Sequence, residues 1–367
     1  MTVPHGGHTT PAFAAVRDAF LDLLHTGRET GAAVAVLHRG RPVVEIWGGW
    51  RDQHRTHPWT ADTLVHTYSV GKPLAALATL TAVADGALDL DDPVADVWPE
   101  YGQAGKERTT LRHLLAHQGG LPAFPETAAH LPLLADDQLR AALARAEPEF
   151  APGTAHAEHA LTYGHLLDGV LRGTGAASLG QVFRDRIARP LGLDAHFGVP
   201  AQDLPRVADL EYGDARWPTA TAGEPGSLEH RAMTRPTGAL DVEVLNGPAW
   251  RRAEFPAIGL HTTASAIGKF YAGLVDPGGP VAGLLGERVH RELLSPQARG
   301  TDLFLGHEVT WSLGFQLSGD EVAMGGAGGS AAWVSQGEEY ACAYVTRRLA
   351  GFDRVDTIEH AVRECLS

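Results

Sequence analysis

Apolar residues recur along this chain at two different spacings, and each spacing predicts a type of element. Residues 10–27 carry apolar side chains at the spacing of one helix face, which predicts an amphipathic helix. The runs AAVAVL (32–37) and VVEIW (43–47) flank the turn HRGRP, a pattern typical of a β-hairpin. Further strand-like stretches lie near the other end, at 309–317, 331–335 and 340–346.

The middle of the chain has a different pattern. Residues 70–195 are rich in Ala and Leu at helical spacing, with short Pro/Gly interruptions. Residues 200–255 show weak periodicity and many Pro, Gly and Asp residues, so we expect long surface loops there. Two more helices are predicted, at 263–275 and at 353–366.

Strand-like segments at both ends of the chain and helical segments between them predict an α+β fold. We expect one antiparallel sheet, flanked by terminal helices, with a helical lobe inserted. The whole chain, 1–367, would form a single catalytic unit. Its α/β lobe would contain about 1–66 and 255–367, and its helical and loop lobe about 67–254.

Charge and targeting signals exclude some classes of partner. The 44 acidic residues outnumber the 30 basic ones, for a formal net charge of −14, so we expect no nucleic-acid partner. The longest nearly apolar run, 73–84, is shorter than the about 20 residues needed to span a bilayer. The first residues lack a basic segment followed by an apolar one, so we expect a cytoplasmic protein without a membrane partner. The sequence leaves the oligomeric state open.

The basic residues themselves point to a site. Of the 30, 27 are arginine and three are lysine: Lys72, Lys106 and Lys269. Lys72 belongs to the tetrapeptide Ser69-Val70-Gly71-Lys72, an S-x-x-K arrangement. Lysine, unlike arginine, can lose its proton and act as a base. The rarity of lysine therefore favours a chemical role for Lys72 over a solvated surface charge.

The surroundings of this tetrapeptide predict a helix that begins at Ser69. Leu74, Leu77, Leu80 and Val83 follow at helical spacing, and Gly86 ends the segment. Lys72, one turn after Ser69, would lie on the same face and reach the serine oxygen. The free N–H groups at a helix start favour negative charge, which would stabilise an oxyanion nearby.

Several segments in order resemble the serine β-lactamase and penicillin-binding protein superfamily, and most of all class C β-lactamases and family VIII carboxylesterases. Besides SVGK, these segments are LDLDDPVADVWPE, TLRHLLAHQGGLP, PGT, HALTYGHLLDGVL, IARPLGL, WRRAEFP and GGAGGSAAW. The resemblance covers nearly the whole chain. It implies an α/β lobe and a helical lobe with the active site between them, a Ser69 nucleophile and a Lys72 partner.

Two motifs of this family are altered. Where the family has a tyrosine in its Y-x-N or Y-H-A motif, this chain has Glu158, followed by His159-Ala160. Where the family has K-T-G or H-x-G, this chain has Met324-Gly325-Gly326. Tyr163 lies five residues after Glu158, about 140° around a helix, and cannot replace the missing tyrosine.

Glu158 beside Lys72 would change the acid–base chemistry. An ionised Glu158 would hold the lysine protonated, and the carboxylate would then act as the general base. A desolvated Glu158 could instead stay protonated and act as a general acid. Met324 would make the wall of the site that this third motif forms apolar, and it would weaken the binding of a substrate carboxylate. We therefore expect no efficient hydrolysis of ordinary β-lactams and favour a bulky or apolar acyl substrate.

These arguments assign Ser69, Lys72 and Glu158 to catalysis. The residues expected to contact substrate are Tyr68, His156, Met324, Gly325, Gly326 and Gly328. The resemblance also implies an oxyanion hole formed by the N–H of Ser69 and a second N–H near Gly326–Gly328. We expect an acyl-enzyme that cleaves a small-molecule ester or amide, or transfers its acyl group to an amine or alcohol.

Two alternatives remain open from the sequence. In the first, Glu158 performs acid–base chemistry on a biosynthetic intermediate, such as cyclisation, elimination or isomerisation, without acylation of Ser69. In the second, the chain is a binding protein that has lost turnover. No nucleotide fingerprint appears, and His113 and His117 lack the glutamate of an H-E-x-x-H motif, so we expect no cofactor and no metal.

Overall fold

The computed structural model describes residues 3–367. Its largest element is a nine-stranded sheet in the order β1-β3-β2-β13-β12-β11-β10-β9-β8, with every neighbouring pair antiparallel. The strands are β1 (His5–Thr9), β2 (Gly31–His38), β3 (Arg41–Gly49), β8 (Ala298–Thr301), β9 (Glu308–Trp311), β10 (Gln316–Ser318), β11 (Glu321–Gly326), β12 (Ser330–Ser335) and β13 (Tyr340–Thr346).

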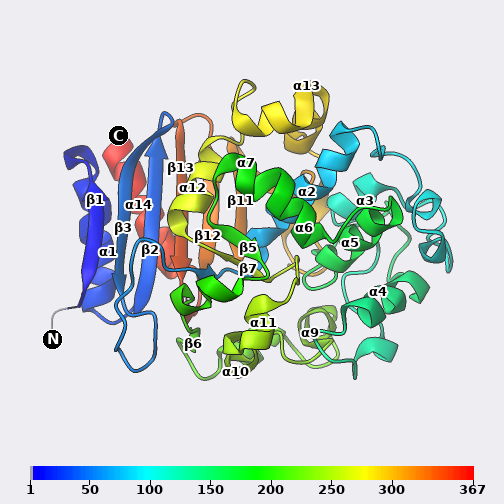
Figure 1. Ribbon diagram of the computed structural model, residues 1–367, viewed down its shortest axis with the longest axis horizontal. Coiled ribbons are helices and arrows are strands. Elements are labelled where there is room, and N and C mark those ends of the chain that lie inside the picture. Colours follow the sequence, from blue (N-terminus) through cyan, green and yellow to red (C-terminus); the bar gives the residue numbers. More distant parts are fainter. Residues whose placement is uncertain (1–2) are drawn as a thin grey trace.

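The two ends of the chain meet in this sheet, as predicted. β2 pairs with β13 along its whole length, from Ala32 opposite Thr346 to His38 opposite Tyr340. In Figure 1 the blue N-terminal strands and the orange-red C-terminal strands accordingly lie side by side. The α+β fold with an antiparallel sheet is therefore confirmed.

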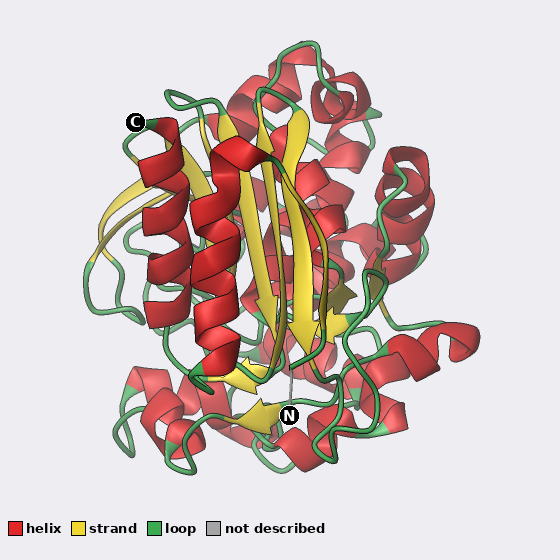
Figure 2. Ribbon diagram, turned by 90° about the vertical axis from the view of Figure 1, so that its left-hand side faces the viewer, coloured by secondary structure: helices red, strands yellow, loops and turns green. Residues whose placement is uncertain are grey.

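Helices cover both faces of the sheet. α1 (Ala14–His25) and α14 (Asp353–Leu366) lie next to each other on one face, as Figure 2 shows. α12 (Ala264–Ala272) packs on the other face against β2, β12 and β13. Side chains alternate between these layers because successive residues of a strand point to opposite faces. In β13, Cys342 and Tyr344 join the α1–α14 core, whereas Ala343 and Val345 join the core that contains α12.

The middle of the chain forms the helical part. Its longer helices are α2 (Lys72–Ala84), α4 (Asp136–Arg145) and α5 (Tyr163–Gly173), and α13 (Pro280–Leu294) packs against α2. Shorter helices surround them: α3 (Leu111–Leu115), α6 (Leu179–Phe183) and α7 (Arg189–Leu191). Two small sheets complete this part, one of β4 (Val65–His66), β7 (Leu260–Thr262) and β5 (Ala195–Phe197), the other of β6 (Glu211–Tyr212) and β14 (Arg348–Leu349). The division into two lobes near residues 66 and 255 stays a prediction.

Three local expectations differ from the structure. Residues 200–255, expected as loops, contain four short helices: α8 (Trp217–Ala222), α9 (Leu228–Thr234), α10 (Val242–Asn246) and α11 (Pro248–Arg252). The predicted strand 309–317 is broken into β9 and β10, which pair as a tight hairpin. β1 was not predicted, because its sequence HGGHT has no apolar alternation.

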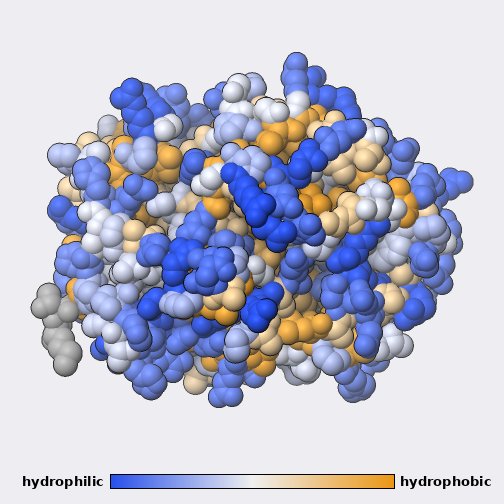
Figure 3. Space-filling view, viewed as in Figure 1, coloured by the Kyte–Doolittle hydropathy of each residue, from blue (hydrophilic) through white to orange (hydrophobic). Residues whose placement is uncertain are grey.

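Within residues 3–367, no helix combines the length and the apolar character needed to cross a bilayer. Hydrophilic side chains cover much of the face in Figure 3, with smaller apolar areas between them.

Candidate active site

Ser69 lies at a strained entry into α2. The preceding residue, Tyr68, has φ 50° and ψ −131°, a conformation that is unfavourable for a bulky side chain. A 3₁₀ turn over Ser69–Gly71 then leads into α2, whose second residue is Pro73. Proline is accepted there because first-turn N–H groups have no helical acceptor. Backbone strain of this kind is concentrated at functional sites.

Lys72 and Glu158 complete a three-residue cluster with Ser69. The Lys72 Nζ donates a hydrogen bond to the Ser69 Oγ at 2.6 Å and lies 2.9 Å from the Glu158 Oε1. The lysine side chain is fully buried, and only 8% of the glutamate side chain is exposed. The structure thus brings the three predicted catalytic side chains together.

The electrostatics of this cluster differ in part from the expectation. Burial lowers the pKa of Lys72, and the neighbouring Glu158 carboxylate opposes that shift without cancelling it. Burial therefore outweighs the attraction of the glutamate in the direction of the lysine pKa shift. Lys72 releases its proton more easily than a free lysine does, as a base for a serine hydroxyl requires.

Histidines hold the loop that carries Glu158. The His159 Nε2 accepts a hydrogen bond from the Leu121 N–H at 3.2 Å, and its Nδ1–H donates to the Ala157 carbonyl at 2.8 Å. Burial lowers the pKa of His159 to about 4, so the ring stays neutral near pH 7. The His156 ring donates to the Gly300 carbonyl at 3.2 Å and does not line the cavity beside Ser69. Both histidines therefore support the loop, and for His156 this differs from the expected substrate contact.

Asp302, which the sequence did not single out, also holds the loop that carries Glu158. It is fully buried and accepts a hydrogen bond from the Glu158 N–H at 3.1 Å. It also accepts from the N–H groups of Phe304 and Leu305 at 2.9 and 3.0 Å, and from the Trp311 indole at 2.9 Å. One carboxylate thus ties the Glu158 loop to the turn between β8 and β9.

A cavity of about 390 Å³ opens beside the catalytic cluster. Ser69 and Glu158 line one side of it. Most of the remaining lining is apolar: Ala160, Met233, Phe304, Leu305, Gly325, Gly326, Ala327 and Phe352. The polar contributors are Thr221, Glu229, His307 and Gln316. A cavity of this character suits an uncharged, apolar acyl group.

The third wall is formed by backbone rather than by the Met324 side chain. Met324 is buried in an apolar cluster with Trp311 and does not line the cavity, whereas Gly325 and Gly326 do. A Cβ on Gly326 would lie 2.1 Å from the Thr67 carbonyl oxygen, so only glycine allows β11 to approach the Ser69 segment this closely.

Two backbone amides are available as an oxyanion hole. The N–H groups of Ser69 and Ala327 have no hydrogen-bond acceptor within residues 3–367, and both residues line the cavity. Gly328 turns away from it, because its Cα faces Leu349 and its carbonyl accepts from Arg354. Tyr68 is also directed away, since its hydroxyl donates to the Ala239 carbonyl at 3.2 Å. The candidate for the second donor is thus the N–H of Ala327, which lies inside the expected range.

Tyr163 does not replace the missing tyrosine. Its hydroxyl donates to the Leu115 carbonyl at 3.1 Å, and burial raises its pKa far above the usual range. It is therefore a structural side chain of the helical part, as its spacing from Glu158 predicted.

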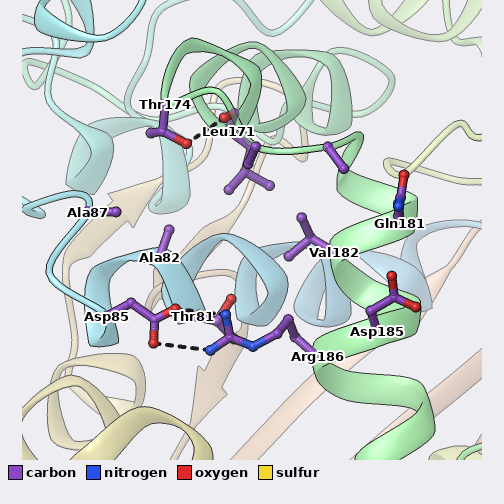
Figure 4. Close-up of a pocket in the computed structure, with 12 residues that line it drawn as sticks. Thr81, Ala82, Asp85, Ala87, Leu171, Thr174, Gln181, Val182, Asp185 and Arg186 are labelled. Atoms are coloured by element: carbon purple, nitrogen blue, oxygen red, sulfur yellow. Dashed lines mark hydrogen bonds and ion pairs between the residues drawn. The ribbon is translucent and has the colours of Figure 1, made fainter.

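Other places in the structure lack this combination of groups. A cavity of about 290 Å³ between α2, α5 and α6 contains an Arg186–Asp85 pair with N···O distances of 2.7 and 3.1 Å (Figure 4), but no nucleophile–base pair. Among residues 3–367, no three His, Cys, Asp or Glu side chains are placed to hold a metal ion. The His113 Nδ1 instead accepts from the Thr110 N–H and caps α3.

Comparisons with known proteins identify the family of this chain. A family model described as Beta-lactamase matches residues 16–364. Esterase/beta-lactamase LipL of Mycobacterium tuberculosis (strain ATCC 25618 / H37Rv) is 32% identical over 362 residues, which cover 94% of this chain and 83% of LipL.

Solved structures of similar proteins have the same fold. The crystal structure of a family VIII carboxylesterase superposes with a TM-score of 0.86 at 31% identity, covering 99% of this chain and 100% of the other. A penicillin-binding protein homologue from Caulobacter crescentus gives a TM-score of 0.87 at 31% identity, with the same coverage.

Proposed function

The chain belongs to the beta-lactamase family, and from this we propose that it cleaves a small-molecule ester through an acyl-enzyme on Ser69. The observation that carries the proposal is the contact of the Lys72 Nζ with both the Ser69 Oγ and the Glu158 Oε1, at 2.6 and 2.9 Å. Relatives described as an esterase/beta-lactamase and a family VIII carboxylesterase support the reaction type.

The first step is acylation with Lys72 as base. The ion pair and a neutral lysine–carboxylic acid pair contain the same protons and differ only in which of the two residues carries one of them, and burial favours the neutral pair. From the neutral pair, Lys72 takes the Ser69 proton while the Ser69 Oγ attacks the ester carbonyl. The N–H groups of Ser69 and Ala327 stabilise the oxyanion. Glu158 gives its proton to the leaving alcohol, which leaves an acyl-serine, a lysine ammonium and a glutamate carboxylate.

The second step releases the acyl group. Glu158, now ionised, takes a proton from an incoming water, which attacks the acyl carbonyl. Lys72 returns its proton to the Ser69 oxygen as the ester bond to serine breaks, so the starting protonation states are restored. An alcohol or amine acceptor in place of water would give acyl transfer by the same route.

The lining of the cavity supports the class of substrate. Its apolar side chains suit an ester with an apolar acyl group, and it contains no lysine or arginine to bind a substrate carboxylate. Ordinary β-lactams, which carry such a carboxylate, fit this cavity poorly.

The kinetic test uses p-nitrophenyl esters of increasing acyl length. We expect wild-type protein to hydrolyse them and Ser69→Ala to be inactive. We expect Glu158→Gln to lower kcat by about 10²- to 10⁴-fold, the size of a general acid–base contribution. Hydrolysis that survives Ser69→Ala would contradict the proposal.

A second candidate function follows from the same ion pair. Glu158 directed into the cavity could carry out acid–base chemistry on a biosynthetic intermediate without acylation of Ser69. Activity on such a compound would then survive Ser69→Ala and be lost in Glu158→Gln. Tight ligand binding without turnover by the wild type would instead indicate a binding protein.

A further inference from the structure

One charged side chain in the cavity has no role in the chemistry above. Glu229 lies in the first turn of α9, is half-buried, and lines the cavity together with Met233 of the same helix. Its carboxylate lies beside Gly223, where any side chain would collide with it. The glutamate is therefore packed at the cavity wall.

Glu229 has no charged partner in the described part of the chain. No hydrogen bond or ion pair joins its carboxylate to residues 3–367, whereas Arg231 of the same helix pairs with Glu149 at 2.8 Å. The other acidic residue of the cavity, Glu158, has Lys72 as its partner at 2.9 Å. A partly desolvated carboxylate without a partner is unfavourable, and a cation bound beside it would relieve this cost.

Away from the N–H groups of Ser69 and Ala327, the rest of the cavity contains no cationic side chain that would attract an anion. Its lining includes no lysine or arginine, and His307 is its one further titratable side chain. The formal net charge of the chain, −14, adds a field that favours cationic over anionic ligands. Apolar walls next to a single free carboxylate are complementary to an ammonium group carried on apolar carbon atoms.

We propose that Glu229 makes this cavity selective for esters whose apolar acyl chain carries a positively charged amine. The inference rests on the proposed esterase function and adds a substrate class to it. Glu229 takes no part in bond making; it pairs with the ammonium and so increases kcat/KM for cationic esters over neutral ones.

The test compares three p-nitrophenyl esters of matched shape at several chain lengths. Their acyl chains end in a trimethylammonium group, in the isosteric tert-butyl group, or in a carboxylate. The assays are run at pH 8, where a histidine side chain with the ordinary pKa is uncharged. We expect kcat/KM at the best chain length to favour the trimethylammonium ester over the tert-butyl ester by roughly two- to fivefold, the size of one partly exposed ion pair. The carboxylate ester should be the poorest substrate.

Two glutamate variants separate a local contact from the general field. Glu229→Gln should abolish the preference for the trimethylammonium ester over the tert-butyl ester. Glu224→Gln removes the same charge from an exposed residue outside the cavity and should leave the preference intact. The proposal is overturned if Glu229→Gln keeps the preference, or if both variants reduce it equally.

A binding measurement keeps this result independent of the esterase proposal. If no ester is turned over, the esterase proposal has failed, and calorimetry with the amide analogues on Ser69→Ala protein then tests the cation preference alone. Tighter binding of the trimethylammonium amide than of the tert-butyl amide, lost in Ser69→Ala/Glu229→Gln, supports the role of Glu229. Equal binding of the two amides rejects it.

Discussion

A carboxylate at position 158 changes what the neighbouring lysine can do. The family motif that this segment resembles has a tyrosine at this place, whereas here Glu158 and Lys72 form a buried pair 2.9 Å apart. A carboxylate holds its proton less strongly than a phenol, so it is a weaker base and a stronger acid. The pair should therefore favour an ester with a poorer leaving group that needs protonation.

Replacing Glu158 by tyrosine tests this interpretation. We expect Glu158→Tyr to hydrolyse p-nitrophenyl acetate, whose leaving group needs no acid, roughly tenfold faster than wild type, because the phenolate is the stronger base. Glu158→Phe is the matched control, since it lacks only the hydroxyl. Equal rates for the Tyr and Phe variants would show that proton transfer by the side chain at position 158 does not limit the rate of hydrolysis.

All three lysines bind oxygen atoms that a larger arginine could not reach in the same way. The Lys106 Nζ donates to the Gln103 and Ala146 carbonyls, and the Lys269 Nζ to the Leu191 carbonyl at 2.8 Å. Only Lys72 contacts a nucleophile. Lys72 and Lys106 are buried, whereas Lys269 is exposed, so the rarity of lysine alone did not mark a site, and the S-x-x-K spacing singled out Lys72.

Site residues were predictable where their signal was local. Ser69 and Lys72 are three positions apart, and Glu158 stands between the recognisable segments PGT and HALTYG. Asp302 and Glu229 were not predictable in this way. Asp302 meets Glu158 across 144 positions, and Glu229 lies in a segment without periodicity that was expected to form loops. Contacts of this kind are set by tertiary packing rather than by spacing.

At the scale of elements, a buried ion pair joins the two ends of the chain. The Glu29 Oε2 accepts hydrogen bonds from Arg354 at 2.7 Å, Tyr344 at 2.6 Å and Thr346 at 2.7 Å. Arg354, in the first turn of α14, also donates to the Gly328 carbonyl at 3.0 Å. The same arginine therefore holds both the N-terminal strands and the turn that carries Ala327.

Removing this arginine should destabilise the fold. Arg354→Met leaves Glu29 buried without its partner, and we expect the free energy of unfolding to fall by about 3–5 kcal/mol. Urea unfolding followed by circular dichroism measures the change. The double variant Glu29→Gln/Arg354→Met should recover part of the loss, because it removes the unpaired charge. A loss below about 1 kcal/mol for Arg354→Met would contradict this account.

Elements were predictable where hydrophobic periodicity was strong. The hairpin of β2 and β3 and the helices α1 and α14 all carry regular apolar positions. The break between β9 and β10 could not be predicted, because the segment WSLGF stays mostly apolar through the turn. Gly314, with φ 97°, bends the chain there. A glycine with positive φ ends a strand that composition alone would extend.

Across the whole molecule, several buried histidines tie stability to pH. Burial lowers the pKa of His261 to about 3 and that of His159 to about 4, and it lowers the pKa values of His66 and His117 well below the ordinary value. In the unfolded chain these rings take up protons near pH 6.5. Below that pH the unfolded state binds protons that the folded state does not, so acid favours unfolding.

We therefore expect stability to fall as the pH drops from about 6.5 towards 5, before carboxylates titrate. Each buried histidine contributes up to about 1.4 kcal/mol per pH unit in this window. Urea midpoints at pH 7.5, 6.5, 5.5 and 5.0 measure the slope. His261→Gln should reduce the slope of the free energy of unfolding against pH by the contribution of about one proton, up to about 1.4 kcal/mol per pH unit. A free energy of unfolding that stays constant from pH 7 to 5 would contradict the neutral, buried state of these rings.

The most direct test of the central claim is the mass of the intact protein after brief incubation with a p-nitrophenyl ester, quenched in acid. Wild-type protein should gain the mass of one acyl group, and peptide mapping should place that group on Ser69. Ser69→Ala should gain none. The account is contradicted if wild type turns the ester over without an adduct on Ser69, or if Ser69→Ala acquires the same adduct.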